Sequence, residues 1–356
     1  MKKNFGLVLV VAVVLVMAFV GPNEVMAKDN WLVGFSNPAG QNPALIYQAK
    51  AMENRGKVLG IDFTQLDANL NIDKQISDID MLVSKKCDAI VVYPNDAKAL
   101  SPALQRAKNA GVKLFAIAYN MKELDDPEAY GPIITEIIER GYVSSRGTAR
   151  YIAERTKGKA NILVVTIGVP VPSIRAQTDT FLDELKKYPG LKVLEEIGNP
   201  NDQSSGARPL VENMINKYKG KIDVIWCYND PTAVGAYGAV QAAGLKNVII
   251  TGMNADEMGI DALKKGMIDI TWDINPPIVG KLIIEAVYEV LSGKKKIYEM
   301  PRGIVAPETL YEKKDVNKYI PWAVRAEQLK DPKLPNGVSE FPHQRLLRGR
   351  VLYLWV

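Results

Sequence analysis

The chain has 356 residues, of which 47% are hydrophobic and 24% charged, and its formal net charge at pH 7 is +5. This length suffices for two domains of ordinary size, each with a substantial core. The charge is mild and the basic residues are scattered, which argues against a nucleic-acid-binding protein. The densest basic run, Lys294-Lys295-Lys296, ends a helical pattern, where the helix dipole favours cations.

Residues 1–27 have the pattern of a secretory signal. A basic start is followed by the uncharged apolar stretch 5–20 and by small residues ending at Ala27. These 16 apolar residues are fewer than the roughly 20 that span a bilayer, which favours cleavage near Ala27 over an uncleaved anchor. We therefore expect an exported protein, periplasmic or extracellular, that begins near Lys28.

From Trp31 the chain alternates short β-branched runs with longer helical patterns, which is typical of βαβ units and a parallel sheet. We predict an α/β fold with two similar doubly wound parallel-sheet domains, joined by a hinge, and a ligand cleft between them. The predicted strands are 31–36, 61–66, 88–93 and 113–118 in the first half, and 161–167, 191–197, 223–228, 248–252 and 268–273 in the second.

The charged stretch 121–141, which contains Pro and Gly, and the segment Asp273–Pro277 are the predicted crossings between the domains. More than one crossing predicts a hinge of limited freedom. The predicted parts are an N-terminal domain of residues 28–139 plus 276–302, a C-terminal domain of residues 140–275 plus 303–330, and the tail 331–356. This tail is predicted either to be partly disordered or to dock on the C-terminal domain.

Two segments that start 135 residues apart are nearly alike, Asp88-Ala-Ile-Val-Val-Tyr-Pro-Asn-Asp96 and Asp223-Val-Ile-Trp-Cys-Tyr-Asn-Asp230. Each precedes an Ala-rich helical pattern that stops at a glycine, Gly111 or Gly244. The repeat predicts that one strand, polar turn and helix occur in both halves. Two such halves that face each other form a cleft lined by the polar turns.

The starts of the repeated helices carry proline signals. Ser101-Pro102 predicts an N-cap followed by proline at the first helical position, and Asp230-Pro231 predicts the same in the second copy. A helix cap is therefore a strong explanation for Asp230 that needs no ligand.

The sequence lacks the motifs for several kinds of catalysis and cofactor binding. The single histidine, His343, lies in the tail, and no Gly-x-Gly, Gly-Lys-[Ser/Thr] or Gly-x-Ser-x-Gly motif occurs. We expect no metal, no cofactor and no catalytic residues. Cys87 and Cys227, one in each half, are predicted to be buried free thiols, because a disulfide between the halves would lock the cleft.

Amide, carboxylate, guanidinium and aromatic side chains follow the predicted strands. Such groups suit a sugar, because planar polar groups pair with hydroxyls and aromatic rings cover the apolar sugar face. Each is also an ordinary turn, cap or core residue. Arg175 stands out because it opens a helix, where the dipole disfavours a cation, and so needs an anionic or hydroxyl partner. The candidate ligand-binding residues are Asn42, Tyr119, Asn120, Arg175, Gln177, Asn229, Asn254, Trp272 and Asp273.

Residues 31 to about 305 resemble the ribose-binding type of periplasmic sugar-binding proteins, the type I solute-binding proteins of ABC importers. The best-matching segments are Ile222–Asp230, Ala233–Ala236, Gln241–Gly244 and Ile249–Asn254. The resemblance implies that Asn229 and Asn254 hydrogen-bond a sugar.

Other positions depart from the ribose-binding pattern. Asn42-Pro43 matches, but the two aromatic residues that usually follow are Ala44 and Leu45. Tyr119-Asn120 stands where the family has Asp-Arg, and Gln177 replaces one arginine of the usual pair. Trp272-Asp273 is similar to the Trp-Asp of autoinducer-2 and rhamnose-type receptors. The resemblance therefore implies a different sugar or a small polyol-like ligand.

The functional hypothesis is an exported, monomeric solute receptor, not an enzyme, that closes on a sugar-like molecule and delivers it to an ABC-type permease. Nucleic acid is not an expected partner. One alternative is a cleft enzyme on a sugar or phosphosugar, with Asp96, Asp230 or Asp273 as acid or base. The other alternative is a sensor that signals to a chemoreceptor or kinase.

Overall fold

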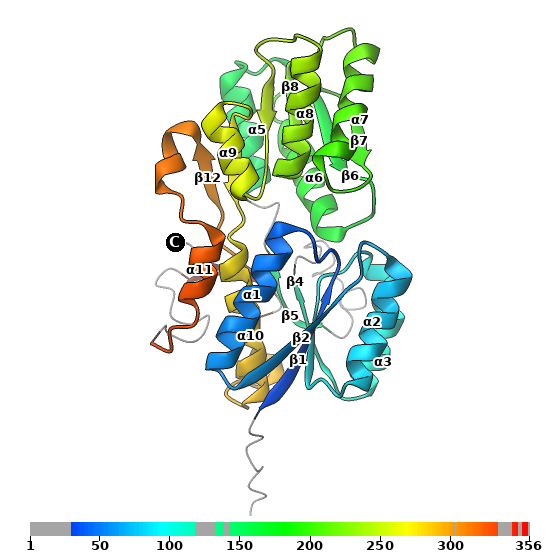
Figure 1. The fold of residues 1–356 in the computed structure, drawn as a ribbon, viewed down its shortest axis with the longest axis vertical. Helices are drawn as coiled ribbons and strands as arrows, with labels where there is room; N and C mark the ends of the chain where they lie inside the picture. Colours follow the sequence, from blue (N-terminus) through cyan, green and yellow to red (C-terminus); the bar gives the residue numbers. More distant parts are fainter. Residues whose placement is uncertain are drawn as a thin grey trace, which may run out of the picture.

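The computed structural model describes residues 30–117, 133–138, 143–301, 303–333, 344–347 and 351–354. These form two stacked α/β lobes (Figure 1), which confirms the predicted fold class. The predicted signal 1–27, the candidates Tyr119 and Asn120, and His343 lie outside the described residues. Within the described ranges, no helix combines the length and apolar character needed to cross a membrane.

The first lobe is built on an eight-stranded sheet with the order β13-β14-β11-β5-β4-β3-β1-β2. All its strand pairs are parallel except β13 with β14. The strands are β1 (Trp31–Asn37), β2 (Ile61–Asp67), β3 (Ala89–Val92), β4 (Lys113–Ile117), β5 (Ile133–Ile138), β11 (Gly303–Val305), β13 (Gln344–Leu347) and β14 (Val351–Leu354).

Helices cover both faces of this sheet, α1 and α10 on one side and α2 and α3 on the other (Figure 1). In β3, Ala89 and Val91 join the core under α1 and α10, whereas Ile90 and Val92 join the core under α2 and α3. All four residues of β3 are apolar because the strand is buried on both faces. The helices of this lobe are α1 (Pro43–Val58), α2 (Ile72–Ser84), α3 (Ala97–Asn109), α10 (Pro276–Leu291) and α11 (Trp322–Gln328).

The second lobe has a six-stranded sheet with the order β12-β10-β9-β8-β6-β7, in which only β12 is antiparallel. Its strands are β6 (Ala160–Ile167), β7 (Leu191–Asn199), β8 (Val224–Cys227), β9 (Ile249–Thr251), β10 (Ile270–Asp273) and β12 (Thr309–Glu312). Its helices are α5 (Ser144–Arg155), α6 (Pro172–Leu185), α7 (Ser204–Lys217), α8 (Asp230–Ala242) and α9 (Glu257–Lys265).

The predicted repeat is present in both lobes. The order β4-β3-β1-β2 in the first sheet corresponds to β9-β8-β6-β7 in the second, so β3-α3 and β8-α8 occupy equivalent places. Gly111 and Gly244 follow the two helices with φ angles of 87° and 67°, a left-handed conformation that glycine adopts at little cost. Cys87 and Cys227 are buried free thiols, as predicted.

The predicted helix starts are wrong by a few residues. Helix α3 begins at Ala97, because the Asp96 carboxylate accepts a hydrogen bond from the Ala99 amide at 2.9 Å and caps the helix before Ser101 is reached. Pro102 therefore lies inside α3. In the second copy Asn229 is the N-cap, and Asp230 is the first residue of α8.

The chain crosses between the lobes more often than predicted. After β5 it enters the second lobe, returns at α10, crosses again between β11 and β12, and returns at α11, which packs on α1. The sequence places residues 303–330 in the C-terminal domain, but β11 pairs with β5 in the first sheet. Residues 133–138 of the predicted linker form β5. The three residues of β11 are too few for a periodic signal.

The tail also differs from its predicted docking site. β14 pairs in parallel with β11, which places residues 351–354 on the first sheet and not on the C-terminal domain.

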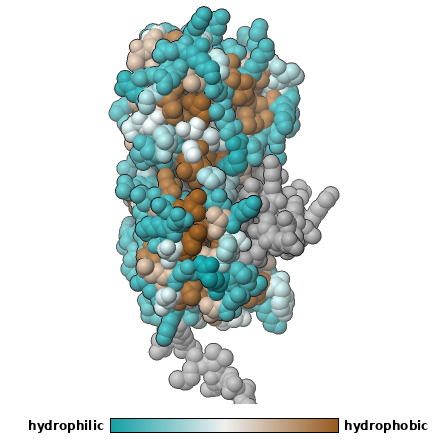
Figure 2. All heavy atoms as spheres, turned by 90° about the vertical axis from the view of Figure 1, so that its right-hand side faces the viewer, coloured by the Kyte–Doolittle hydropathy of each residue, from teal (hydrophilic) through white to brown (hydrophobic). Residues whose placement is uncertain are grey.

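Burial of apolar residues between sheets and helices leaves the side of the molecule in Figure 2 mostly hydrophilic, with hydrophobic patches in both lobes.

Candidate ligand-binding cleft

A cavity of about 30 Å³ lies where the two lobes meet. This volume holds little more than one or two water molecules, so the lobes are closed on each other. Its walls follow the carboxyl ends of β1, β3, β6, β7 and β8, the edge at which open α/β sheets bind ligands. The lining residues are Pro38, Ala39, Asn42, Leu45, Leu70, Tyr93 and Asn95 from the first lobe, and Ile167, Val171, Ile174, Asp202 and Tyr228 from the second.

Asp202, in the loop after β7, is the centre of the polar contacts in this cleft. Its side chain accepts hydrogen bonds from the Tyr228 hydroxyl at 2.5 Å and from the Asn229 amide at 2.6 Å. The other carboxylate oxygen accepts a bond of 2.8 Å from the Asn42 amide of the first lobe. Asp202 is 7% exposed, and its φ of 59° is left-handed. Such strained backbone is often found at functional sites.

Asn42 and Asn229 act as helix caps and as cleft residues at the same time. The Asn42 side-chain oxygen accepts from the Ala44 amide at 2.9 Å at the start of α1. The Asn229 oxygen accepts from the Thr232 amide at 2.9 Å at the start of α8. Each oxygen therefore fixes a helix end, while each amide nitrogen donates to Asp202. One asparagine side chain can therefore cap a helix and contact the cleft carboxylate at the same time.

A second contact joins the lobes. The Tyr93 hydroxyl after β3 lies 2.9 Å from the Ser173 hydroxyl at the start of α6, and both are buried. With the bond between Asn42 and Asp202, this contact links the first lobe to two elements of the second. Hydroxyl and amide groups therefore hold the closed arrangement.

Asn95 faces the cavity with an unsatisfied side chain. It is 1% exposed, and neither its side-chain nitrogen nor its oxygen has a hydrogen-bond partner in the described parts of the chain. Its backbone amide donates to the Gln75 side chain at 2.9 Å, which fixes the turn. A buried amide without partners costs roughly 1–3 kcal/mol per unsatisfied group, so this position is suited to a ligand or water.

Two predicted residues are buried near the cleft but do not line the cavity. The Gln177 amide nitrogen donates to the Tyr228 carbonyl at 3.2 Å, and Asn254 has a φ of 110° with its backbone amide bonded to the Trp272 carbonyl. Among the described residues, the side-chain oxygens of Gln177 and Asn254 both lack a partner. Each retains hydrogen-bonding capacity that a ligand or water can use in another arrangement of the lobes.

Arg175 lies on the surface instead of in the cleft. Its guanidinium pairs with Glu196 at 2.5 Å and Asp179 at 2.9 Å, and its side chain is 40% exposed. The sequence argument that this cation needs an anionic partner is correct. The partners, however, are carboxylates of the same lobe.

Trp272 lies on the hinge side and does not line the cavity. It belongs to a buried apolar cluster with Ala44, Met253 and Trp322, and its indole nitrogen donates to the Thr148 hydroxyl at 3.0 Å. A Cβ atom at Gly147 would approach the Trp272 ring to 2.3 Å, so glycine there makes room for the ring.

Asp273 fastens α11 to the hinge. Its carboxylate accepts from the Asn275 amide at 2.7 Å and the Trp322 indole at 3.1 Å, and pairs with Arg325 at 2.7 Å. Burial raises the pKa of Asp273, and the nearby Arg325 opposes this shift. An aspartate directly after Trp272 thus has a structural reason that the sequence did not reveal.

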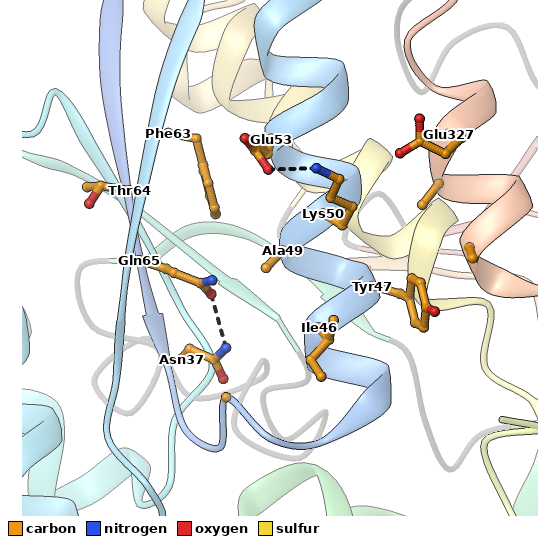
Figure 3. A pocket seen from close by; sticks show the side chains of 13 residues that line it. Asn37, Ile46, Tyr47, Ala49, Lys50, Glu53, Phe63, Thr64, Gln65 and Glu327 are labelled. Atoms are coloured by element: carbon orange, nitrogen blue, oxygen red, sulfur yellow. Dashed lines mark hydrogen bonds and ion pairs between the residues drawn. The ribbon is translucent and has the colours of Figure 1, made fainter. Parts of the chain in front are cut away.

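A larger pocket of about 660 Å³ lies on the outside of the first lobe, between α1, β2 and α11 (Figure 3). Four of its polar side chains pair with one another. The Asn37 amide donates to Gln65 at 3.2 Å, and Lys50 pairs with Glu53 at 3.2 Å. This internal pairing distinguishes it from the small interlobe cavity, where Asn95 is unsatisfied.

Two residues of the cavity wall, Asp202 and Asn95, are absent from the candidates predicted from the sequence. Asp202 follows a correctly predicted strand, so the rule that ligands bind at strand ends could have found it. Asn95 is the counterpart of Asn229 in the repeat, which was the available signal. No cluster of three or more His, Cys, Asp or Glu suited to a metal ion occurs in the described ranges.

Residues 33–295 match the family described as periplasmic binding protein domain. The chain belongs to this family. Its sequence is 25% identical over 302 residues to the ribose import binding protein of Bacillus subtilis, an alignment that covers 83% of this chain and 95% of the relative. It is also 25% identical over 307 residues to the xylitol-binding protein of Mycolicibacterium smegmatis, covering 85% and 82%.

Solved structures show the same two-lobed fold as this periplasmic binding protein. An ABC sugar transporter subunit from Rhodobacter sphaeroides has a TM-score of 0.71 at 24% identity, with 80% of this chain and 98% of the other covered. A solute-binding protein from Agrobacterium vitis with bound allitol has a TM-score of 0.73 at 22% identity, with coverage of 82% and 98%.

Proposed function

We propose that this periplasmic binding protein is an exported receptor that captures a sugar or polyol-like molecule by closing its two lobes and delivers it to an ABC-type permease. The observation that carries this proposal is the hydrogen bond between Asn42 and Asp202 across the cleft. A ligand hydroxyl can donate to the carboxylate and accept from the amide, and so take the place of this contact. Ribose, xylitol and allitol in the names of the relatives support the ligand class.

The cleft contains the donor and acceptor types that a hydroxylated ligand needs. Tyr93 and Tyr228 provide hydroxyls, Asp202 provides acceptors, and Asn95 provides both a donor and an acceptor. Opening of the lobes breaks the contacts between Asn42 and Asp202 and between Tyr93 and Ser173. A bound ligand replaces these contacts and favours the closed state. The permease recognises the closed state by its shape.

The alternative of a cleft enzyme finds less support. Asp96 caps α3, and Asp273 pairs with Arg325. Asp230 accepts from Thr271 at 2.6 Å and from the Asp256 amide at 3.2 Å. All three candidate carboxylates have structural partners, and none of them lines the cavity. We therefore propose a receptor without catalytic residues.

Export rests on residues 1–27, whose pattern supports a signal cleaved near Ala27 and a periplasmic or extracellular location. The proposed partner is a membrane permease, and the proposed state is a monomer. A receptor for a chemoreceptor or kinase would use the same cleft. Import of the ligand in cells with and without the gene distinguishes transport from sensing.

Isothermal titration of the exported protein with aldoses, polyols and autoinducer-type furanoses tests the ligand class. We expect at least one ligand with a Kd below millimolar. Changing Asn229 or Asn254 to Ala should make the binding free energy less favourable by roughly 1–3 kcal/mol. Arg175→Ala is the control that should leave affinity unchanged, because Arg175 is paired on the surface. Absence of binding across the panel would contradict the proposal.

A further inference from the structure

The cleft contains a buried carboxylate, Asp202, with no cation beside it in the described ranges. Among the twelve described residues that line the cavity, Asp202 alone carries a charge. Its observed partners are the amides of Asn42 and Asn229 and the hydroxyl of Tyr228, all neutral. No ion pair joins Asp202 to a Lys or Arg of the described ranges. The described residues therefore give this cavity a negative potential, which burial strengthens.

The opposite wall provides a neutral group that is free to bind. Asn95 lines the same cavity from the first lobe, with a donor and an acceptor both unpaired and 1% of its surface exposed. A ligand between the lobes can thus meet a carboxylate on one side and an amide on the other. The carboxylate accepts donors only, whereas the amide serves either role.

The remaining walls are largely apolar. Seven of the twelve lining residues are aliphatic or proline, and they come from both lobes: Pro38, Ala39, Leu45, Leu70, Ile167, Val171 and Ile174. A hydroxyl placed against these groups would lose its hydrogen bonds to water without replacement, at a cost of about 1–3 kcal/mol. The cavity therefore favours a ligand with one edge that carries no hydroxyl.

We propose that Asp202 and Asn95 determine specificity, and that the ligand is an uncharged or cationic sugar or polyol with an apolar edge, such as a deoxy or amino sugar. An acid sugar or a sugar phosphate is rejected, because its anion would be buried near Asp202, beside which the described residues place no cation. This inference rests on the proposed function and adds the class of ligand and the residues that select it.

Titration calorimetry with C6-matched ligands tests the inference. For glucose, galactose and mannose, the 6-deoxy, parent, uronate and 6-phosphate forms differ only at one carbon, and 2-amino forms add a cation. We expect the tightest ligand to be a deoxy or amino form, and each anionic form to bind at least about 100-fold more weakly than its parent. An anion that binds as tightly as its parent overturns the inference.

Asp202→Asn keeps the shape of the side chain and removes its charge. We expect binding of the tightest ligand to weaken at least about tenfold, and the discrimination against anions to fall to less than about tenfold. A variant that weakens neutral and anionic ligands equally contradicts the role of the charge. Asp261→Asn, at an exposed ion pair of α9, is the matched control with unchanged binding.

A second variant keeps the test decisive if Asp202→Asn does not fold. Asn95→Ala removes an unpaired amide, so we expect an unchanged or higher unfolding temperature together with at least about tenfold weaker binding. Asn109→Ala, at the exposed end of the helix that follows Asn95, is its control. Unchanged affinity in Asn95→Ala overturns the inference. Absence of binding by every sugar overturns the proposed function as well, whereas binding that ignores Asp202 and Asn95 overturns only the inference.

Discussion

The two copies of the repeated unit place the same residue in different environments. In the second copy Asn229 caps α8 and donates to Asp202, so both ends of its amide are engaged. In the first copy the counterpart Asn95 has an unpaired amide, because Asp96 caps α3 in its place. The inserted Pro94 moves the cap by one residue. A one-residue difference thus leaves one wall of the cleft internally bonded and the other free to bind a ligand.

The aspartates that follow these asparagines differ just as much. Asp96 caps a helix at the edge of the cleft. Asp230 is fully buried and connects α8 to Thr271 and to Asp256, which caps α9. In the first lobe, the Asn-Asp pair therefore provides an unpaired amide and a helix cap. In the second lobe, the same pair caps α8 and connects it to its neighbours.

Replacement of the two aspartates should give the largest contrast. We expect Asp230→Ala to lower the free energy of unfolding by about 3 kcal/mol, because the Thr271 hydroxyl and the Asp256 amide lose their buried partner. Asp96→Ala should lower it by about 1 kcal/mol, the usual effect of losing a cap. Urea unfolding of both variants measures the difference, and equal losses would show that the copies are equivalent in stability.

The buried pair Asp230 and Asp256 should also make the second lobe sensitive to pH. Burial raises the pKa of Asp256 to about 6 and that of Asp230 well above its ordinary value. A raised carboxyl pKa means that the folded state holds its proton more tightly. This contribution is therefore complete below the unfolded pKa of about 4 and is lost as pH rises through 6.

We expect the wild type to lose about 2 kcal/mol relative to Asp256→Asn between pH 4 and pH 7. Comparison with this variant cancels the groups whose pKa is lowered, such as Glu53 and Glu184, which act in the opposite direction. Denaturant unfolding at several pH values checks this difference. Parallel pH profiles for the two proteins would argue against titration of Asp256.

The two asparagines should differ in their effect on folding. Asn229→Ala removes a cap and a partner of Asp202, for an expected loss of about 1–2 kcal/mol in the free energy of unfolding. Asn95→Ala removes an amide without partners and should leave the free energy of unfolding unchanged or higher. Chemical denaturation without ligand measures both values. A larger loss in Asn95→Ala than in Asn229→Ala would reverse the comparison.

The smallest expected effect concerns closure itself. Tyr93→Phe removes the hydrogen bond to Ser173 between the lobes, which contributes about 1 kcal/mol and so about a fivefold change in the ratio of closed to open protein. Small-angle X-ray scattering of the ligand-free protein should show a larger radius of gyration. Tyr298→Phe, at a side chain that is 76% exposed, should leave the scattering unchanged.

Prediction from the sequence succeeded where signals are local. All nine predicted strands are present, because apolar runs bounded by polar turns depend on neighbouring residues. It failed for Ser101, where the competing cap Asp96 lies one turn earlier, and for β11, which is only three residues long. Among the candidate ligand residues, Asn42 lies in the cleft wall, Asn229 bonds to Asp202, Arg175 pairs on the surface, and Asp273 holds the hinge.

The sequence by itself determined the alternation of strands and helices, the repeat, the glycine helix ends and the family resemblance. These depend on spacing and on interactions within a few turns of chain. The tertiary structure decided which polar groups meet. Asn42 and Asp202 are 160 residues apart, and Asp273 is 49 residues from Trp322. Such contacts depend on the packing of two lobes and on the path of the hinge, which no local pattern encodes. The contact between Asn42 and Asp202 joins the two lobes, so it forms only when the lobes close.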